Sequence, residues 1–193
     1  MADEEFMQAT WRALCTHGYA DLTMQDIADE SERSKAALHY HYEGKADLLE
    51  SFLDHVSACF LDRVRAADPG PGTDPVRRLD AVLEAALSPP GDDPEDIQTA
   101  LLELKARAPH EPAVRKRVRE TDSEFRGLLA DILAAGVEAG RFRPDVDSEA
   151  TARVFVTALS GAQLRRVSLG ESPEAARAVL DVHIEGVTLE ASG

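Results

Sequence analysis

The sequence of 193 residues has few aromatic residues, few cysteines and no long apolar run. Aromatic side chains make up 5% of the chain, too few for a site that stacks planar ligands. Its two cysteines, Cys15 and Cys59, both fall in apolar helical patterns, so we expect buried free thiols, with a redox switch as the alternative. No stretch approaches the ~18 apolar residues of a membrane span, and the N-terminus lacks the basic and apolar regions of a signal peptide. We therefore expect a cytoplasmic protein without a membrane partner.

Positive charge is also scarce. There are 36 acidic against 21 basic residues, and the formal net charge is −15. The first 55 residues hold 12 acidic and 4 basic side chains. Taken alone, such a surface argues against nucleic acid as a partner, because phosphates repel it. Only four of the basic residues are lysine, and this composition leaves two interpretations open: a merely acidic protein, or one adapted to concentrated salt.

Sequence motifs of catalysis are missing. The chain has no glycine-rich phosphate loop, no nucleophile elbow, no HExxH pair and no paired cysteine ligands, so we expect neither an enzyme nor a cofactor. His39 and His41 are two positions apart and do not share a helix face. No third ligand completes a set at metal-binding spacing, so we predict no metal site.

Helical periodicity runs through the whole chain. Apolar residues recur at i, i+3 and i+4, which predicts an all-α fold of about nine helices. The first helix is expected over residues 4–17, ending at Gly18, and residues 68–74 form a Pro/Gly segment without periodicity. We predict a small head of three short helices in residues 1–46. A larger helical body should follow in residues 47–193.

Two N-cap signals bound the central part of the head. Thr23, followed by Asp26, opens one short helix, and Ser34 opens the next over residues 35–42. Two short helices at this separation fit a helix-turn-helix, although an ordinary helical hairpin would share the spacing.

Four motifs are more specific than that spacing. They are His-Gly-Tyr at 17–19, Thr-Met-Gln-Asp-Ile-Ala at 23–28, Ser-Lys-Ala-Ala-Leu-His-Tyr-His-Tyr at 34–42, and Lys-Ala-Asp-Leu-Leu at 45–49. In order and separation they resemble the N-terminal domain of the tetracycline-repressor (TetR) family over about residues 4–56. The chain departs from that pattern at 31–33, where Ser-Glu-Arg replaces the usual Ala-Gly-Val. Without the turn glycine, Glu32 must adopt the turn differently or bear strain.

The resemblance implies that residues 1–46 are a DNA-binding helix-turn-helix domain and that residues 47–193 bind an effector and dimerise. It also implies a double-stranded DNA operator as partner. The first residues of the recognition helix would meet base edges, Tyr40 the groove or a phosphate, and His39 and Lys45 the DNA backbone. The residues assigned to DNA are Thr23, Ser34, Lys35, Ala36, Ala37, His39, Tyr40 and Lys45. Residues 31–45 carry a net charge of +1 and are the least acidic part of the head. Because molar salt screens charge to about 3 Å, we expect DNA binding to weaken little, or to strengthen, as salt rises.

The family resemblance also implies a homodimer and a small-molecule effector of unknown identity. Two apolar stripes in the last two helices would form the dimer interface or only complete the monomer's core. The first comprises Val154, Phe155, Ala158, Gly161 and Ala162, and the second comprises Val179, Leu180, His183, Ile184 and Val187. The residues expected around an effector are Leu79, Leu83, Gln98, Leu101, Leu104, His110, Phe125 and Leu128. A two-fold dimer predicts a pseudo-palindromic operator. We favour a repressor over an activator, the alternative being a helical interaction or sensor protein that has lost DNA binding.

Overall fold

The computed structural model describes residues 2–31, 34–88 and 94–189. Within these ranges the chain forms nine α-helices and no strand, which confirms the all-α prediction. The helices are α1 (Ala2–Asp21), α2 (Met24–Asp29), α3 (Lys35–His41), α4 (Lys45–Ala67), α5 (Pro75–Leu87), α6 (Pro94–Ala106), α7 (Pro112–Glu138), α8 (Ser148–Leu169) and α9 (Pro173–Val187). None of these described helices is long and apolar enough to cross a lipid bilayer.

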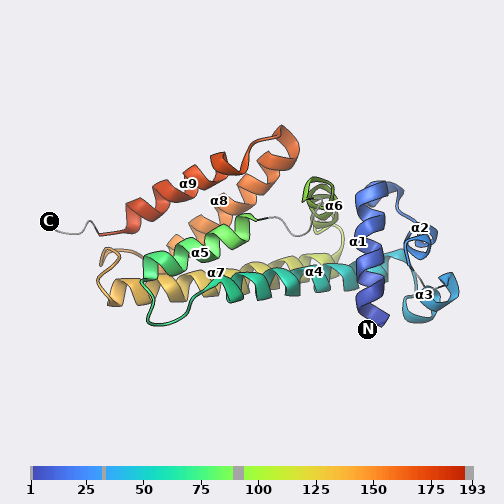
Figure 1. Ribbon diagram of the computed structural model, residues 1–193, viewed down its shortest axis with the longest axis horizontal. Coiled ribbons are helices and arrows are strands. Elements are labelled where there is room, and N and C mark those ends of the chain that lie inside the picture. Colours follow the sequence, from blue (N-terminus) through green and yellow to red (C-terminus); the bar gives the residue numbers. More distant parts are fainter. Residues whose placement is uncertain (1, 32–33, 89–93, 190–193) are drawn as a thin grey trace. The chain divides into compact units, whose positions relative to one another are not determined.

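The chain divides into two compact units, each with its own core. The first unit comprises residues 1–58 and 90–119, and the second comprises residues 59–89 and 120–193. Helices α1, α2, α3 and α6 belong to the first unit, whereas α5, α8 and α9 belong to the second (Figure 1). The assignment of DNA binding to residues 1–46 and of effector binding and dimerisation to residues 47–193 concerns function and stays a prediction.

The core of the first unit is built mainly from α1, α4 and α6. Its fully buried side chains include Phe6, Leu14, Ile27, Leu38, Leu48, Phe52, Ile97 and Leu104. The buried hydroxyl of Thr10 donates to the Phe6 carbonyl at 2.7 Å, so this polar group is satisfied inside its own helix. The same core thus holds both short helices of the head and α6.

Helix α1 is broken at Gly18. This residue has φ 68° and ψ 175°, a conformation that residues with a Cβ rarely adopt. The break agrees with the prediction that the first helix ends at Gly18, although helical structure resumes briefly as far as Asp21. The direction of the chain as it enters the helix-turn-helix is therefore decided at this glycine.

The second unit packs the end of α4 with α5, α7, α8 and α9 around one core. Phe142, which follows α7, is fully buried there. A methyl group at Gly136 would lie 2.0 Å from Phe142 Cδ2. Only glycine therefore lets the Phe142 ring rest against α7 at this point.

The segment 68–74 is more ordered than a flexible linker. The Asp68 carboxylate accepts two hydrogen bonds from Arg78, at 2.8 and 2.7 Å, and these side chains are only 11% and 12% exposed. The bonds from Arg78 lower the pKa of the Asp68 carboxyl. Asp74 caps α5 by accepting from the Val76 amide, with Pro75 at the first helical position.

The prediction for the two cysteines is wrong in part. Cys15 is half-buried, but Cys59 is exposed on α4. The inner face of α4 in this stretch is taken by Leu61 and Val64. An apolar stripe read from the sequence is wider than the face that the fold buries, and Cys59 lies at its outer edge.

Candidate nucleic-acid interface

Helix α2 begins with a reciprocal cap. Thr23 Oγ1 accepts from the Asp26 amide at 3.2 Å, and Asp26 Oδ2 accepts from the Thr23 amide at 2.7 Å. The Thr23 hydroxyl also donates to the same carboxylate at 2.7 Å. These bonds from Thr23 lower the pKa of the Asp26 carboxyl. The capping box is thus confirmed, and a contact between the Thr23 hydroxyl and a phosphate would have to compete with it.

Helix α3 presents a distinct outer face. Ser34 caps the helix by accepting from the Ala37 amide at 3.3 Å, and Leu38 is fully buried beneath it. Lys35, Ala36, His39 and Tyr40 are exposed, whereas Ala37 is half-buried. Residues 36, 39 and 40 share one side of a helix. The predicted recognition helix therefore turns four of its predicted DNA residues toward solvent.

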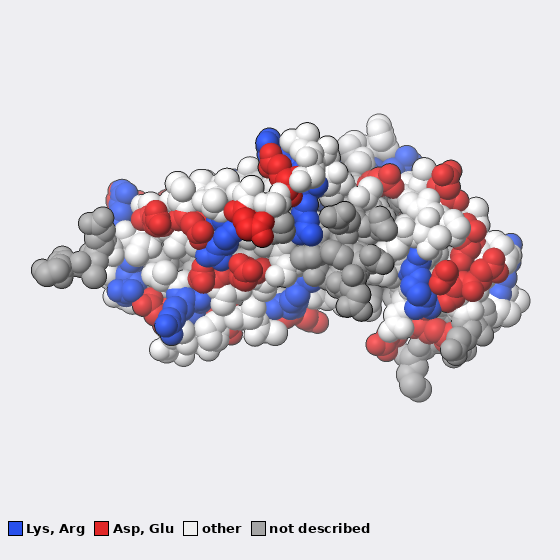
Figure 2. Space-filling view, turned by 45° about the horizontal axis from the view of Figure 1, so that its top comes forward, with Lys and Arg blue, Asp and Glu red and all other residues white. Residues whose placement is uncertain are grey.

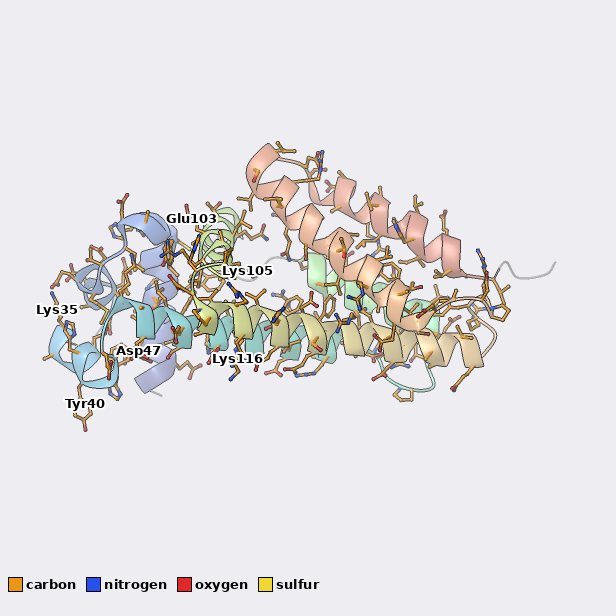
Figure 3. The ribbon with its side chains drawn as sticks, turned by 180° about the vertical axis from the view of Figure 1, so that it is seen from behind. Lys35, Tyr40, Asp47, Glu103, Lys105 and Lys116 are labelled. Atoms are coloured by element: carbon orange, nitrogen blue, oxygen red, sulfur yellow. The ribbon has the colours of Figure 1, made fainter. Side chains whose placement is uncertain are left out.

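Tyr40 is the most exposed large apolar side chain of the described residues, at 87%. Its side chain extends away from α3 (Figure 3). A tyrosine at such a position offers a partner both an apolar ring and a hydroxyl group. The exposure of Tyr40 is thus consistent with the predicted contact to a groove or a phosphate.

The two residues after Tyr40 serve the head itself. Tyr42 is buried, and its ring lies edge-on to Phe6 with ring centroids 6.1 Å apart. The His41 ring lies 5.6 Å from the Phe6 ring. Both rings therefore help to pack the head against α1. Glu32 and the turn conformation predicted for it lie outside the described residues.

Lys45 lies inside the head rather than reaching outward. Its Nζ donates to the Tyr19 carbonyl at 2.8 Å and lies 5.0 Å from the centroid of the Tyr19 ring. Partial burial lowers the pKa of this ammonium group. The sequence motif gave no sign of this partner, because Tyr19 precedes Lys45 by 26 residues.

The head retains its acidic character in three dimensions. On the face shown in Figure 2, acidic side chains cover more of the first unit than basic ones do. One surface pair, Arg12 with Glu30 at 3.2 Å, joins α1 to the end of α2. The metal prediction concerned His39 and His41, and no cluster of three metal-binding side chains occurs among the described residues.

The eight residues predicted around an effector divide between the units. Leu79, Leu83, Phe125 and Leu128 belong to the core of the second unit, and Gln98, Leu101, Leu104 and His110 belong to the first unit. Leu79, Leu83 and Leu104 are at most 1% exposed and serve as core. Gln98 differs from them, because its buried Oε1 has no hydrogen-bond partner among the described residues.

The predicted dimer residues also separate into inner and outer positions. Phe155, Leu180 and Ile184 are buried in the core of the second unit, which leaves little of their surface for a partner. Ala158 and Val187 pack at the edge of that core, and Ala162 and His183 are half-buried. Val179 is 48% exposed. Only part of the two predicted stripes is therefore available on the surface.

Exposed apolar side chains concentrate on the last two helices. Of seven large ones among the described residues, six lie on α8, on α9 or just beyond: Val154, Leu164, Leu169, Val179, Val182 and Leu189, here called the outer apolar set. The opposite side of α9 is held to α5 through Arg177, which pairs with Asp80 and with Glu84. The spacing of Val179 and Val182, three residues apart on one helix face, was the sequence signal for this second face.

Family models cover most of the chain. Residues 6–52 match the family described as bacterial regulatory proteins, tetR family. Residues 75–189 match the C-terminal domain of BetI-type transcriptional repressors.

Individual proteins agree with these families. The chain is 40% identical to a TetR transcription regulator from Haloarcula marismortui, whose crystal structure superposes with a TM-score of 0.88 over 97% of this chain and 98% of that one. A putative regulator from Saccharomonospora viridis, solved in complex with choline, is 25% identical, covers 98% of both chains and gives a TM-score of 0.85. The repressor AcnR of Corynebacterium glutamicum is 24% identical over 95% of this chain and 90% of its own length.

Proposed function

The chain belongs to the tetR family of transcriptional regulators, and from this premise we propose that it is a homodimeric repressor that reads a pseudo-palindromic operator. The matched families and relatives are regulators rather than enzymes, in agreement with the prediction of no enzyme. Such a regulator works in the cytoplasm, where its operator lies.

One observation carries the DNA-binding part of the proposal. Both short helices of the helix-turn-helix have side-chain caps, and α3 turns Lys35, Ala36, His39 and Tyr40 outward. A recognition helix needs this combination: a buried inner face that fixes its position and a free outer face for base edges. The proposed contacts to DNA come from this outer face, with Ser34 and Ala37 at the start of the helix.

The outer apolar set supports the homodimer. Its members on α8 and α9 are large apolar side chains that water covers in a single chain, and exposed apolar side chains that gather on the same helices are typical of association surfaces. If two copies pair there about a two-fold axis, their recognition helices are related by the same axis. The operator should then hold two half-sites about 34–36 Å apart or somewhat more.

A small-molecule effector would release the operator by favouring one conformation of the body. Gln98 supports this part of the proposal, since a buried acceptor without a partner is poised to receive a donor from a ligand. The choline in the structure of the Saccharomonospora relative gives one effector chemistry to test. For this chain we propose only that the effector is small and carries a hydrogen-bond donor.

We further propose that the protein binds DNA in concentrated salt. The net charge of −15 opposes DNA binding in dilute buffer, and the 40% identical relative comes from a halophile. In molar potassium chloride the repulsion is screened to about 3 Å, so contacts to base edges would decide affinity.

Selection of genomic DNA by the purified full chain tests the proposal. The selection is run at 0.1, 1 and 2 M potassium chloride, in parallel with the Tyr40→Ala variant, which keeps the fold but loses the outermost side chain of α3. Recovery of one palindromic sequence by the wild type, reduced in the variant, supports the repressor. Recovery of no sequence at any salt concentration favours the interaction protein that has lost DNA binding.

A further inference from the structure

Tyr19 is held by charged side chains from two other helices of the first unit. Its amide donates to Glu103 Oε2 on α6 at 3.0 Å, and its carbonyl accepts from Lys45 Nζ on α4 at 2.8 Å. Lys45 Nζ and Arg107 Cζ lie 5.0 and 5.8 Å from the centroid of its ring. The amide, the carbonyl and the ring of one residue are thus each fixed by a charge.

The break at Gly18 makes this arrangement possible. With φ 68° and ψ 175°, Gly18 turns the chain out of the helix, so the Tyr19 amide is directed to an acceptor on another helix. Glu103 supplies that acceptor, and Figure 3 shows this residue on α6 beside α1. A hydrogen bond to a carboxylate is roughly twice as strong as one between neutral groups.

The residues of this cluster lie at both ends of the helix-turn-helix. Tyr19 lies four residues before Thr23, the cap of α2, and Lys45 is the first residue of α4, shortly after α3 ends. The bond from Lys45 to Tyr19 therefore joins the entrance of the helix-turn-helix to its exit. Glu103 on α6 and Arg107, directly after α6, then connect the joined ends to that helix.

We propose that Glu103 is a positioning residue for DNA binding, which holds the helix-turn-helix in a fixed orientation on α6 through the Gly18-Tyr19 corner. It touches no DNA in this role, and the inference rests on the proposed repressor function. A head that is loosely fastened must be ordered when it binds, which costs affinity. Loss of the Glu103 bond should therefore weaken operator binding without removing any contact to DNA.

The first test measures, without DNA, whether Glu103 holds the Gly18-Tyr19 corner in place. Glu103→Met keeps the length and helix preference of the side chain but removes the acceptor, whereas Glu103→Gln keeps an acceptor. Glu50→Met is the matched control, because Glu50 is exposed on α4 and has no hydrogen bond or ion pair among the described residues. Amide hydrogen exchange of the full chain is followed by NMR at Tyr19.

Exchange at Tyr19 should be about tenfold faster in Glu103→Met, the effect expected of one lost hydrogen bond. It should stay within about twofold of wild type in Glu103→Gln and in Glu50→Met. Unchanged exchange in Glu103→Met would show that the bond does not hold the corner, and the proposal would be overturned whatever the protein does with DNA.

The second test uses the operator recovered by selection. Relative to Glu50→Met, which loses the same charge, Glu103→Met should bind about fivefold more weakly, with recovery in Glu103→Gln. The slope of log affinity against log salt should be unchanged, because a phosphate contact would alter it. Equal affinity in the two methionine variants, or a changed slope, overturns the positioning role. A wild-type chain that selects no DNA refutes the proposed function. Amide exchange at Tyr19 still tests whether the bond to Glu103 holds Gly18 and Tyr19 in place.

Discussion

Replacing Val182 with aspartate should separate the proposed homodimer into monomers. Val182 lies in α9 and is 67% exposed in a single chain, the largest exposed fraction in the outer apolar set. The substitution removes apolar surface from the proposed interface and puts a carboxylate in its place. Since the side chain makes few contacts within its own unit, the monomer should fold as before.

The expected size of the effect follows from that exposure. Complete burial of a valine side chain contributes roughly 1.5–3 kcal/mol, and about two thirds of Val182 remains to be buried. Each protomer then loses about 1–2 kcal/mol, and a two-fold interface loses about 2–4 kcal/mol because both copies change. The dimer Kd should rise between about 30-fold and about 1,000-fold, and desolvation of the two new charges adds to this.

Sedimentation velocity over a concentration series in molar potassium chloride measures this Kd. Val182→Thr, which has nearly the same shape and no charge, should give a smaller rise. Ala66→Asp adds the same charge at an exposed position of α4 in the same unit and should leave the Kd unchanged. If Val182→Asp and Ala66→Asp dimerise equally well, the outer apolar set does not form the interface.

Three further predictions concern stability and DNA recognition. Gln98→Met should raise the free energy of unfolding by about 1 kcal/mol, because it removes a buried acceptor without a partner. A lower free energy of unfolding, measured by chemical denaturation, would mean that the acceptor has a hydrogen-bond partner in solution. Asp68→Asn should lower that free energy by about 2 kcal/mol at pH 7, since Arg78 stays mostly buried without its carboxylate. The pKa of Asp68 is lowered in the folded chain, so the wild type should keep this advantage above about pH 4 and lose it as the pH falls further; thermal midpoints that stay apart at low pH would contradict this. Lys35→Ala should weaken binding to the selected operator about tenfold and relax the preference at one base pair, whereas an equal loss on unrelated DNA in competition assays would assign Lys35 to a phosphate.

Local signals predicted the head well. The caps at Thr23 and Ser34 and the break at Gly18 depend on residues within a few positions of each other, and all three are present. The partner of Lys45 could not be predicted in this way. Its contact to Tyr19 exists because α1 and α4 meet in one core, and no local pattern encodes that meeting.

Helical periodicity did not predict which face of α9 is buried in the monomer. The pattern in α9 marks Leu180 and Ile184 as apolar, and they are buried in the monomer. It marks Val179 in the same stripe, although this residue faces water together with Val182. A helix with apolar residues on two faces gives no indication of which face the monomer covers first, since that depends on the helices packed beside it.

The bond between Lys45 and Tyr19 has a consequence for protein engineering. This bond joins the two ends of the helix-turn-helix. The outer face of α3 therefore lies on a segment whose ends are held together by a contact inside the head. Lys35, Ala36, His39 and Tyr40 belong to this face, and none of them contributes to the buried core. On the proposed function, exchanging them for those of another family member, with Leu38, Tyr42 and the joined ends kept, should change the operator and leave the scaffold intact. Regulators for new operators should then be obtainable on the same body.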